Sequence, residues 1–265
     1  MKYLDLQRLT CKMEEIQNSF KSKLPFRYLI IDNFFPNSVA KSILQSIPLI
    51  DHKVWDGKTY MDQKKKFQLS SFEEGTVLGD TFDELNSKQF VNWLEDITGF
   101  TDLTGDNSLF GGGLHQTING GFLNVHIDYN IHPKTKLPRK LNVIVFLNLD
   151  WKEEYKGHFE LWDLRNSPGT LMERILPDFN RCVIFETNEI SFHGHPSPLS
   201  TPKGVARKSL ATYYYSTKPT VKELVQENHN TIFANTQGIT GNVRRISNGF
   251  QAMWERIYNL FGLKN

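Results

Sequence analysis

The residues with the clearest chemical potential are a histidine and an aspartate two positions apart, in the run His126-Ile127-Asp128. Residues two apart in a β-strand point to the same face, so an extended backbone brings this imidazole and this carboxylate to one point. Such a pair is the beginning of a two-histidine, one-carboxylate facial triad, which suits non-haem Fe(II). The same pair also occurs as a simple hydrogen-bonded pair at a strand end, so its context must decide.

The context lies about seventy residues further along the chain. His193 and His195 follow a strand-like apolar run and could both lie on one strand face, so spacing leaves open which of them completes a triad. Arg207 and Ser209 come next and share one face at the head of another strand candidate. A guanidinium and a hydroxyl there can bind the distal carboxylate of a dicarboxylic cosubstrate.

Short strands are predicted throughout the second half of the chain, where glycine-rich turns begin at about residue 105. The strand candidates cover 121–128, 140–148, 157–162, 172–177, 181–186, 190–193 and 207–216. Regularly spaced short strands with turn signals are typical of a β-sandwich or jelly roll. Residues 105–218 are therefore expected to form the β core that positions the histidines, the aspartate and the arginine.

The first 104 residues are expected to support this core within the same domain. Apolar spacing predicts helices from Leu9 to Phe20, from Val39 to Ile47 and over about 87–98, with a strand at 28–31. Segment 52–86 is polar and is expected to be irregular.

Residues 219–265 are predicted to be a polar linker followed by an amphipathic helix. The apolar stripe of this helix runs from Val243 to Leu260 at helical spacing. We expect it to pack on its own domain, with a homodimer contact as the alternative.

Composition is that of an ordinary globular protein, with 265 residues, 39% hydrophobic and 23% charged. A net charge of +2 gives no global reason to bind nucleic acid or an anionic membrane, and neither partner is expected. Cys11 and Cys182 are far apart, which argues against a disulfide framework or a zinc site. The N-terminal residues do not form a secretory signal, and the longest apolar run, 143–147, is too short to cross a bilayer. A cytoplasmic location is the default expectation.

Two further features have competing interpretations. Loop 132–140 contains Lys134, Lys136, Arg139 and Lys140 without an acidic residue. A solvated turn is the preferred interpretation, and a lid that attracts an acidic substrate is the alternative. His115 follows a run of three glycines, and lining a pocket and a structural role are equally compatible with its position.

Five motifs in order resemble a known family over about residues 87–217. They are Gly-Gly-Phe-Leu-Asn-Val-His126-Ile-Asp128, Arg139-Lys-Leu-Asn142-Val-Ile-Val-Phe146-Leu-Asn148, Gly157-His-Phe-Glu-Leu-Trp162-Asp163, His193-Gly-His195 and Arg207-Lys-Ser209. This ordered set resembles the Fe(II)/2-oxoglutarate-dependent oxygenases of the prolyl-4-hydroxylase-like superfamily. The resemblance implies a mainly β fold with flanking helices, built on a distorted double-stranded β-helix of the jelly-roll, cupin-like kind.

The resemblance also implies roles for individual residues. His126, Asp128 and His193 would bind the iron, because the family pattern favours His193 over His195. Arg207 would bind the 5-carboxylate of 2-oxoglutarate, with Ser209 assisting.

Weaker candidates for contact with the cosubstrate are Gln116 and Asn142. Gln116 lies where prolyl hydroxylases often have a tyrosine. Asn142 shares a strand face with Phe146, which replaces a tyrosine found in some relatives. A phenyl ring cannot donate that tyrosine's hydrogen bond, so Arg207 and Ser209 would carry more of the binding.

The expected activity is hydroxylation of an unactivated C–H bond, with Fe(II) as cofactor, 2-oxoglutarate and O₂ as cosubstrates, and succinate and CO₂ as coproducts. A prolyl or other amino-acid residue is the best expectation for the substrate. The alternatives are an oxygenase that modifies a small metabolite or sugar, and a catalytically silent β-helix that only binds a ligand. Nucleic-acid demethylation is weaker, because the chain has no basic stripe.

Overall fold

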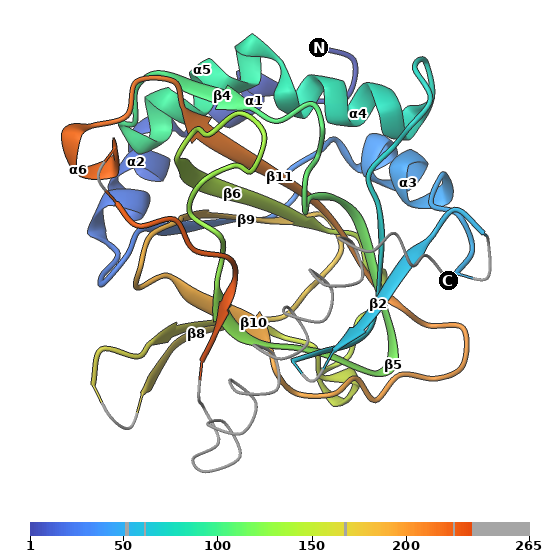
Figure 1. Cartoon of the computed structure of the whole chain (residues 1–265). Coiled ribbons are helices and arrows are strands. Elements are labelled where there is room, and N and C mark those ends of the chain that lie inside the picture. The colour runs from blue at the N-terminus through green and yellow to red at the C-terminus, as the bar shows by residue number, and fades with distance from the viewer. Residues whose placement is uncertain (51–52, 61, 167–168, 225, 235–265) are drawn as a thin grey trace, which may run out of the picture.

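A single curled antiparallel sheet organises the molecule, as Figure 1 shows. The computed structural model describes the chain except for residues 51–52, 61, 167–168, 225 and 235–265. The strands of the described part are β1 (Tyr28–Ile31), β2 (Asp56–Tyr60), β3 (Gln63–Leu69), β4 (Leu103–Gly105), β5 (Gly113–Ile127), β6 (Arg139–Phe146), β7 (Phe159–Asp163), β8 (Thr170–Ile175), β9 (Arg181–Glu186), β10 (Phe192–His195), β11 (Arg207–Ser216) and β12 (Ile232–Phe233).

The strand order makes two halves that face each other. Along the sheet the order is β1-β9-β6-β11-β5-β10-β7-β8, while β3 also pairs with β5, β2 with β3, β4 with β11 and β12 with β5. Strand β5 belongs to both halves, because its first part pairs with β11 and its second part with β10. The mainly β fold predicted from the sequence is confirmed.

A glycine pair lets β5 turn from one half of the sheet to the other. Gly120 has a φ of +74°, a backbone conformation that residues other than glycine rarely adopt. At Gly121 a Cβ atom would lie 2.5 Å from Cγ2 of Thr117, so a larger residue would not fit without movement. The bend carries the second part of β5, with His126, to the half of the sheet that contains β10.

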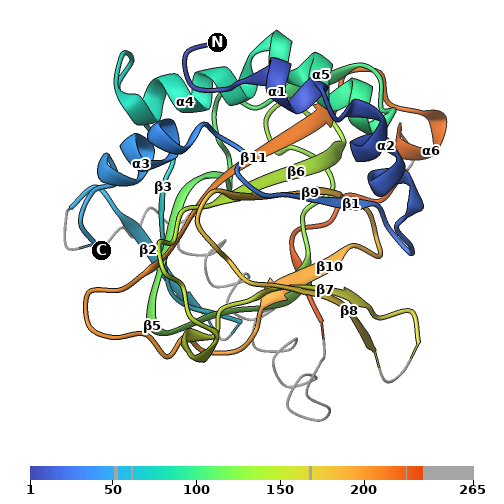
Figure 2. The same cartoon turned by 180° about the vertical axis from the view of Figure 1, so that it is seen from behind.

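Helices cover the outer face of the larger half of the sheet, opposite β10, β7 and β8, as Figure 2 shows from behind. They are α1 (Leu6–Thr10), α2 (Met13–Ser22), α3 (Asn37–Gln45), α4 (Val77–Asn86) and α5 (Lys88–Thr98). Helix α5 begins after Ser87, whose hydroxyl accepts a hydrogen bond from the Phe90 amide, and it ends at Gly99 in a left-handed conformation. A short helix, α6 (Val221–Leu224), and a 3₁₀ turn, η1 (Glu153–Tyr155), complete the described elements.

Alternation along the central strands separates two apolar clusters. On β9, Cys182 and Ile184 pack toward the helices, whereas Val183 and Phe185 point between the two halves of the sheet. Burying alternate faces of one strand in different cores fixes its register, since a slip of one residue would exchange them. This register also determines which side chains of β6 and β11 face the site.

The structure corrects two expectations about the first hundred residues. Segment 52–86 is not irregular, because it contains β2, β3 and α4. The helix expected over 9–20 is divided into α1 and α2. The strand expected at 28–31 is β1, and both β1 and β3 are strands of the main sheet. The C-terminal helix expected over 243–260 lies outside the described residues.

Within the described part of the chain, no helix combines the length and apolar character needed to cross a membrane.

Candidate active site

A cavity of about 360 Å³ lies between the two halves of the sheet. Its size is at the lower end of the range for small-molecule sites. It is lined from several strands at once, which is possible because their alternate side chains point inward. The polar and charged residues among its lining are Gln63, Lys66, Gln68, His115, Thr117, His126, Asp128, Tyr129, Arg139, Asn142, His193, His195, Arg207, Ser209, Tyr213 and Thr231.

His126, Asp128 and His193 form the one cluster of potential metal ligands among the described residues, with one ligand atom of each within 4.8 Å of the others. His126 and His193 are direct cross-strand partners on β5 and β10. Nε2 of His126 lies 3.7 Å from Oδ1 of Asp128, and Nε2 of His193 lies 3.4 Å from Oδ2. Strand pairing therefore brings together two histidines that lie sixty-seven positions apart in the sequence.

The two imidazoles are oriented by the backbone. Nδ1 of His126 lies 2.8 Å from the carbonyl oxygen of Asn124, and Nδ1 of His193 lies 2.9 Å from that of Ser191. A carbonyl can only accept, so each Nδ1 carries a proton and each Nε2 faces Asp128. This is the arrangement in which two neutral imidazoles and a carboxylate fit a divalent cation.

The charge of Asp128 is set by its neighbours. Nη2 of Arg139 lies 3.0 Å from Oδ2 of Asp128, and Nδ2 of Asn142 donates to the same oxygen at 2.7 Å. Burial would raise the pKa of Asp128, but the Arg139 guanidinium beside it holds this pKa well below its usual value. Burial also lowers the pKa of His193 to about 3. At neutral pH the cluster therefore contains an ionised carboxylate and a neutral His193.

Arg139 is held rigidly beside the aspartate. Its guanidinium lies 3.5 Å from the ring centre of Tyr213 and 4.6 Å from that of Tyr129. Its Nε donates to Oδ1 of Asn142 at 2.8 Å. The interpretation of Arg139 as part of a solvated turn is therefore wrong, because β6 begins at this residue and the side chain is buried.

Across the cavity, Arg207 and Ser209 line the wall on β11. Nε of Arg207 donates to the carbonyl oxygen of Gly157 at 2.7 Å, and the guanidinium lies 4.8 Å from the ring centre of Phe146. Burial lowers the pKa of Arg207 to about 9. Phe146 thus provides a flat surface beneath the guanidinium in place of a tyrosine hydroxyl.

Of the two weaker candidates, Gln116 and Asn142, only Asn142 lines the cavity. Gln116 does not line the cavity, since its Nε2 donates at 3.0 Å to the carbonyl oxygen of Pro48 on the other face of β5. Alternation explains this, because the neighbouring His115 and Thr117 both line the cavity. Asn142 does line it, but its amide is engaged by Asp128 and Arg139.

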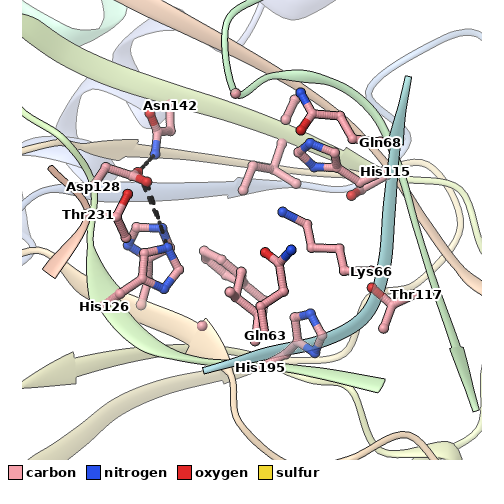
Figure 3. A pocket seen from close by; sticks show the side chains of 18 of the residues that line it. Gln63, Lys66, Gln68, His115, Thr117, His126, Asp128, Asn142, His195 and Thr231 are labelled. Carbon is pink, nitrogen blue, oxygen red and sulfur yellow. Dashed lines mark hydrogen bonds and ion pairs between the residues drawn. The ribbon is translucent and has the colours of Figure 1, made fainter. Parts of the chain in front are cut away.

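His195 lies in the cavity but does not belong to the cluster of potential metal ligands. The register between β10 and β5 shifts between His193 and His195, which places His195 opposite Leu123 rather than beside Asp128. The structure thus separates the two histidines that spacing alone could not. Their surroundings are shown in Figure 3, where His126 and Asp128 lie on one side of the cavity and His195 and His115 on the other.

Several lining residues were not predicted from the sequence. Lys66 is hidden within a run of three lysines, and only the pairing of β3 with β5 brings it into the cavity. Phe233 belongs to the two-residue strand β12, whose pairing opposite His126 brings the two rings to 5.3 Å. Neither has a periodic signal in the sequence, since each position is set by a partner strand far along the chain.

Comparison with known proteins agrees with this geometry. Residues 112–215 match the family model described as the 2OG-Fe(II) oxygenase superfamily. No curated protein matches the chain at a significant level. The matched segment contains the three potential metal ligands His126, Asp128 and His193 together with Arg207 and Ser209. The match confirms the resemblance inferred from the five motifs.

Solved structures of prolyl hydroxylases share the fold. A prolyl hydroxylase from Trichoplax adhaerens, solved with a hypoxia inducible factor oxygen degradation domain peptide fragment, is 17% identical with a TM-score of 0.59 and covers 84% of this chain and 96% of its own. Prolyl 4-hydroxylase from Phytophthora capsici is 19% identical with a TM-score of 0.55, and the match covers 91% of this chain and 76% of the hydroxylase chain. The viral collagen prolyl hydroxylase of Paramecium Bursaria Chlorella virus-1, in its 2OG complex, is 13% identical with a TM-score of 0.50. This match covers 75% of this chain and 99% of the viral chain.

Proposed function

We propose that this chain, an Fe(II)- and 2-oxoglutarate-dependent oxygenase, hydroxylates an unactivated C–H bond of a prolyl or other amino-acid residue. The overall reaction would convert 2-oxoglutarate, O₂ and the substrate R–H into succinate, CO₂ and R–OH. The observation that carries the proposal is the meeting of the His126–Asp128–His193 cluster with Arg207 in one cavity of a prolyl-hydroxylase-like fold.

The residues of the cavity would divide the work as follows. His126, Asp128 and His193 would hold Fe(II), which supplies the oxidising chemistry when it binds with 2-oxoglutarate and O₂. Arg139 and Asn142 keep the Asp128 carboxylate ionised and oriented. A buried anion beside a divalent cation favours metal binding over protonation.

Arg207 and Ser209 would hold the distal carboxylate of 2-oxoglutarate. A guanidinium offers a fork of N–H donors that matches a carboxylate in two-point geometry. Because Nε of Arg207 is already bonded to the carbonyl of Gly157, its two terminal nitrogens would meet the ligand. The ring of Phe146 excludes water from the other face of the guanidinium.

A free small molecule is the second candidate substrate. The short strand β12 borders the cavity, and Thr231 and Phe233 both line it. Asn130 fastens the segment before β12, donating to the carbonyl of Glu227 at 2.8 Å and accepting from the His229 amide at 3.0 Å. A cavity of about 360 Å³ that is bordered by this fastened segment favours a compact substrate over a long peptide.

The proposal is tested by succinate formation and by oxygen incorporation. The protein would be loaded anaerobically with Fe(II) and 2-oxoglutarate, exposed to O₂, and supplied with proline-containing peptides, other peptides, free amino acids or sugars. We expect one class to raise succinate formation and to gain one oxygen atom by mass spectrometry, and Asp128→Ala to abolish both. If only free metabolites are oxidised, the second candidate is favoured. If no supplied compound stimulates succinate formation above the rate of Asp128→Ala, the hydroxylase assignment is contradicted.

A further inference from the structure

A lysine side chain enters the cavity from a strand outside the family match. Lys66 on β3 is the Cα partner of Thr117 on β5, and Thr117 is in turn the partner of Arg207 on β11. The three residues thus form one row across three neighbouring strands, and all three line the cavity. Figure 3 shows the Lys66 side chain reaching inward, with His115 on one side and His195 on the other.

Lys66 has no anionic partner among the described residues. No carboxylate of that part of the chain forms an ion pair with its ammonium group, and Asp128, the one acidic residue lining the cavity, is paired with Arg139. Burial lowers the pKa of Lys66 to about 8, although Asp128 opposes this and Arg207 adds to it. The Lys66 side chain is half-buried, so its ammonium group loses part of its hydration with no carboxylate of the described residues to replace it, and a bound anion would compensate for that loss.

The cosubstrate does not account for this cation. 2-Oxoglutarate has two carboxylates: one belongs with its 2-oxo group at the metal, and Arg207 with Ser209 matches the other. After both are placed, Lys66 is the remaining cation of the cavity without an assigned anion among the described residues.

We propose that Lys66 binds an anionic group, a carboxylate or a phosphate, of the primary substrate. This inference rests on the proposed oxygenase function and adds a charge requirement to it. Lys66 becomes a specificity-determining residue that selects acidic substrates and fixes their position relative to the metal.

Neighbouring side chains offer a further hydrogen-bond donor to such an anion. Within the described residues, Nε2 of His115 and both ring nitrogens of His195 are buried without a hydrogen-bond partner. Neutral His195 has one N–H to donate to the anion, whereas neutral His115 directs its one N–H to the backbone carbonyl of Gly111 and its Nε2 can only accept. Buried polar atoms are normally satisfied, so unsatisfied ones that line a cavity indicate ligand contacts.

The size of the cavity limits what the anion can belong to. With about 360 Å³, the cavity can hold the cosubstrate together with only a small part of a second molecule. The anionic group must therefore lie within a few bonds of the carbon that is oxidised. A free amino acid, a compact carboxylic acid, a sugar phosphate or an acidic side chain of a peptide satisfies this condition.

The first test is anion binding without turnover. Protein loaded with Zn(II), which is redox-inert, and one equivalent of 2-oxoglutarate would be titrated calorimetrically with sodium acetate and with sodium sulfate. We expect wild type to bind one anion per chain and Lys66→Met to bind it about tenfold more weakly or worse, as for the loss of a charge-assisted contact. Lys64→Met removes an equal charge from an exposed position of the same strand and is expected to behave as wild type.

The second test identifies the source of the anion. Succinate formation would be measured with matched pairs, such as an amino acid and its amide, or phosphoserine and serine. The acidic member of a pair should stimulate wild type and Lys64→Met, and should lose this effect in Lys66→Met and Lys66→Gln. Carboxylate pairs and phosphate pairs then distinguish the two kinds of substrate.

Each failure has a separate meaning. If 2-oxoglutarate binds normally but neither acetate nor sulfate binds wild type, or if both bind Lys66→Met equally well, the anion site is refuted and the oxygenase function stands. If Lys66→Met instead weakens 2-oxoglutarate as strongly as Arg207→Ala, Lys66 belongs to the cosubstrate site and the inference is overturned. If wild type binds neither metal nor 2-oxoglutarate, the proposed function itself fails.

Discussion

The side-chain amide of Asn142 connects Arg139 to Asp128. Its Nδ2 donates to Oδ2 of Asp128 at 2.7 Å, and its Oδ1 accepts from Nε of Arg139 at 2.8 Å. The amide therefore aligns a cation and an anion that also contact each other directly at 3.0 Å. Both contacts fall on Oδ2, so the carboxylate is held with Oδ1 toward His126.

The first prediction concerns this link. Asn142→Ala removes one of the two partners that orient Asp128 but leaves all three proposed metal ligands. Residues that orient a ligand in this way typically contribute tenfold to a hundredfold to metal affinity. We expect a loss of about that size in anaerobic Fe(II) titrations, with 2-oxoglutarate binding to the residual metal-loaded protein preserved.

Asn148→Ala is the matched control for this variant. Asn148 is equally buried and donates to the carbonyls of Pro177 and Lys208, away from the metal cluster. It should lose stability without a selective loss of metal affinity. Equal metal affinities for wild type and Asn142→Ala would show that Arg139 alone orients the carboxylate.

The second prediction separates the two histidines of β10. His193→Ala should abolish stoichiometric Fe(II) binding, because a facial site would retain only one imidazole and one carboxylate. His195→Ala should keep most of the metal affinity, since the register shift places His195 opposite Leu123. Metal content after anaerobic dialysis measures both. The opposite ranking of the two variants would exchange their roles.

Much of the strand pattern was predictable because local alternation carries it. β9 and β11 begin and end at the residues predicted. Alternate side chains of β9 are buried in two different clusters, and those of β11 pack in the larger cluster or line the cavity. His126 and Asp128 were likewise predicted as a pair from their spacing on a strand. Which of His193 and His195 joins them depends on a bulge in cross-strand pairing, and such a shift has no mark in the sequence.

The polar strand β3 could not be predicted for a related reason. Its residues include Lys64, Lys65 and Lys66, which resemble a solvated segment when considered alone. Their structure comes from pairing with β2 and β5, and one of the three enters the cavity because of the register. The burial of Arg139 is not predicted from its own segment for the same reason, because its neutralising partner Asp128 lies eleven residues earlier, just after β5.

The third prediction concerns the cosubstrate. Arg207→Ala should leave metal binding intact and weaken 2-oxoglutarate, at a cost on the order of 2–5 kcal/mol for a carboxylate left unpaired in a closed site. Pyruvate, which lacks the distal carboxylate, should lose much less affinity in the same variant. Calorimetry with both acids on Zn(II)-loaded protein measures the difference.

Arg174→Ala provides the control for lost charge, because the Arg174 side chain is largely exposed and points to Glu160 rather than into the cavity. It should bind both acids as wild type does. Equal losses for 2-oxoglutarate and pyruvate in Arg207→Ala would place the guanidinium away from the distal carboxylate.

The fourth prediction is the pH dependence of anion binding at Lys66. In the unliganded cavity the pKa of Lys66 is lowered to about 8, so the side chain is mostly charged at pH 7 and mostly neutral at pH 9. An anion binds the charged form, so its affinity should fall as pH rises through 8, by about tenfold between pH 7 and 9. Bound anion would in turn raise the pKa of Lys66.

The other charged groups that face Lys66 do not produce this change. Asp128 stays ionised, because its pKa lies well below the usual value. Burial lowers the pKa of His115 and of His195 well below the usual value, so both remain neutral throughout this range. In the proposed complex with 2-oxoglutarate, the distal carboxylate would keep Arg207 charged.

Calorimetric titration of the Zn(II)–2-oxoglutarate complex with acetate at pH 7, 8 and 9 measures this dependence. Wild type and Lys64→Met should show the loss of affinity, and Lys66→Met should bind weakly at every pH with no such slope. Buffers of different ionisation enthalpy would report proton uptake on binding near pH 8 in wild type and no such uptake in Lys66→Met. An affinity for acetate that is the same at pH 7 and 9 in wild type would show that the anion is bound by a group other than the Lys66 ammonium.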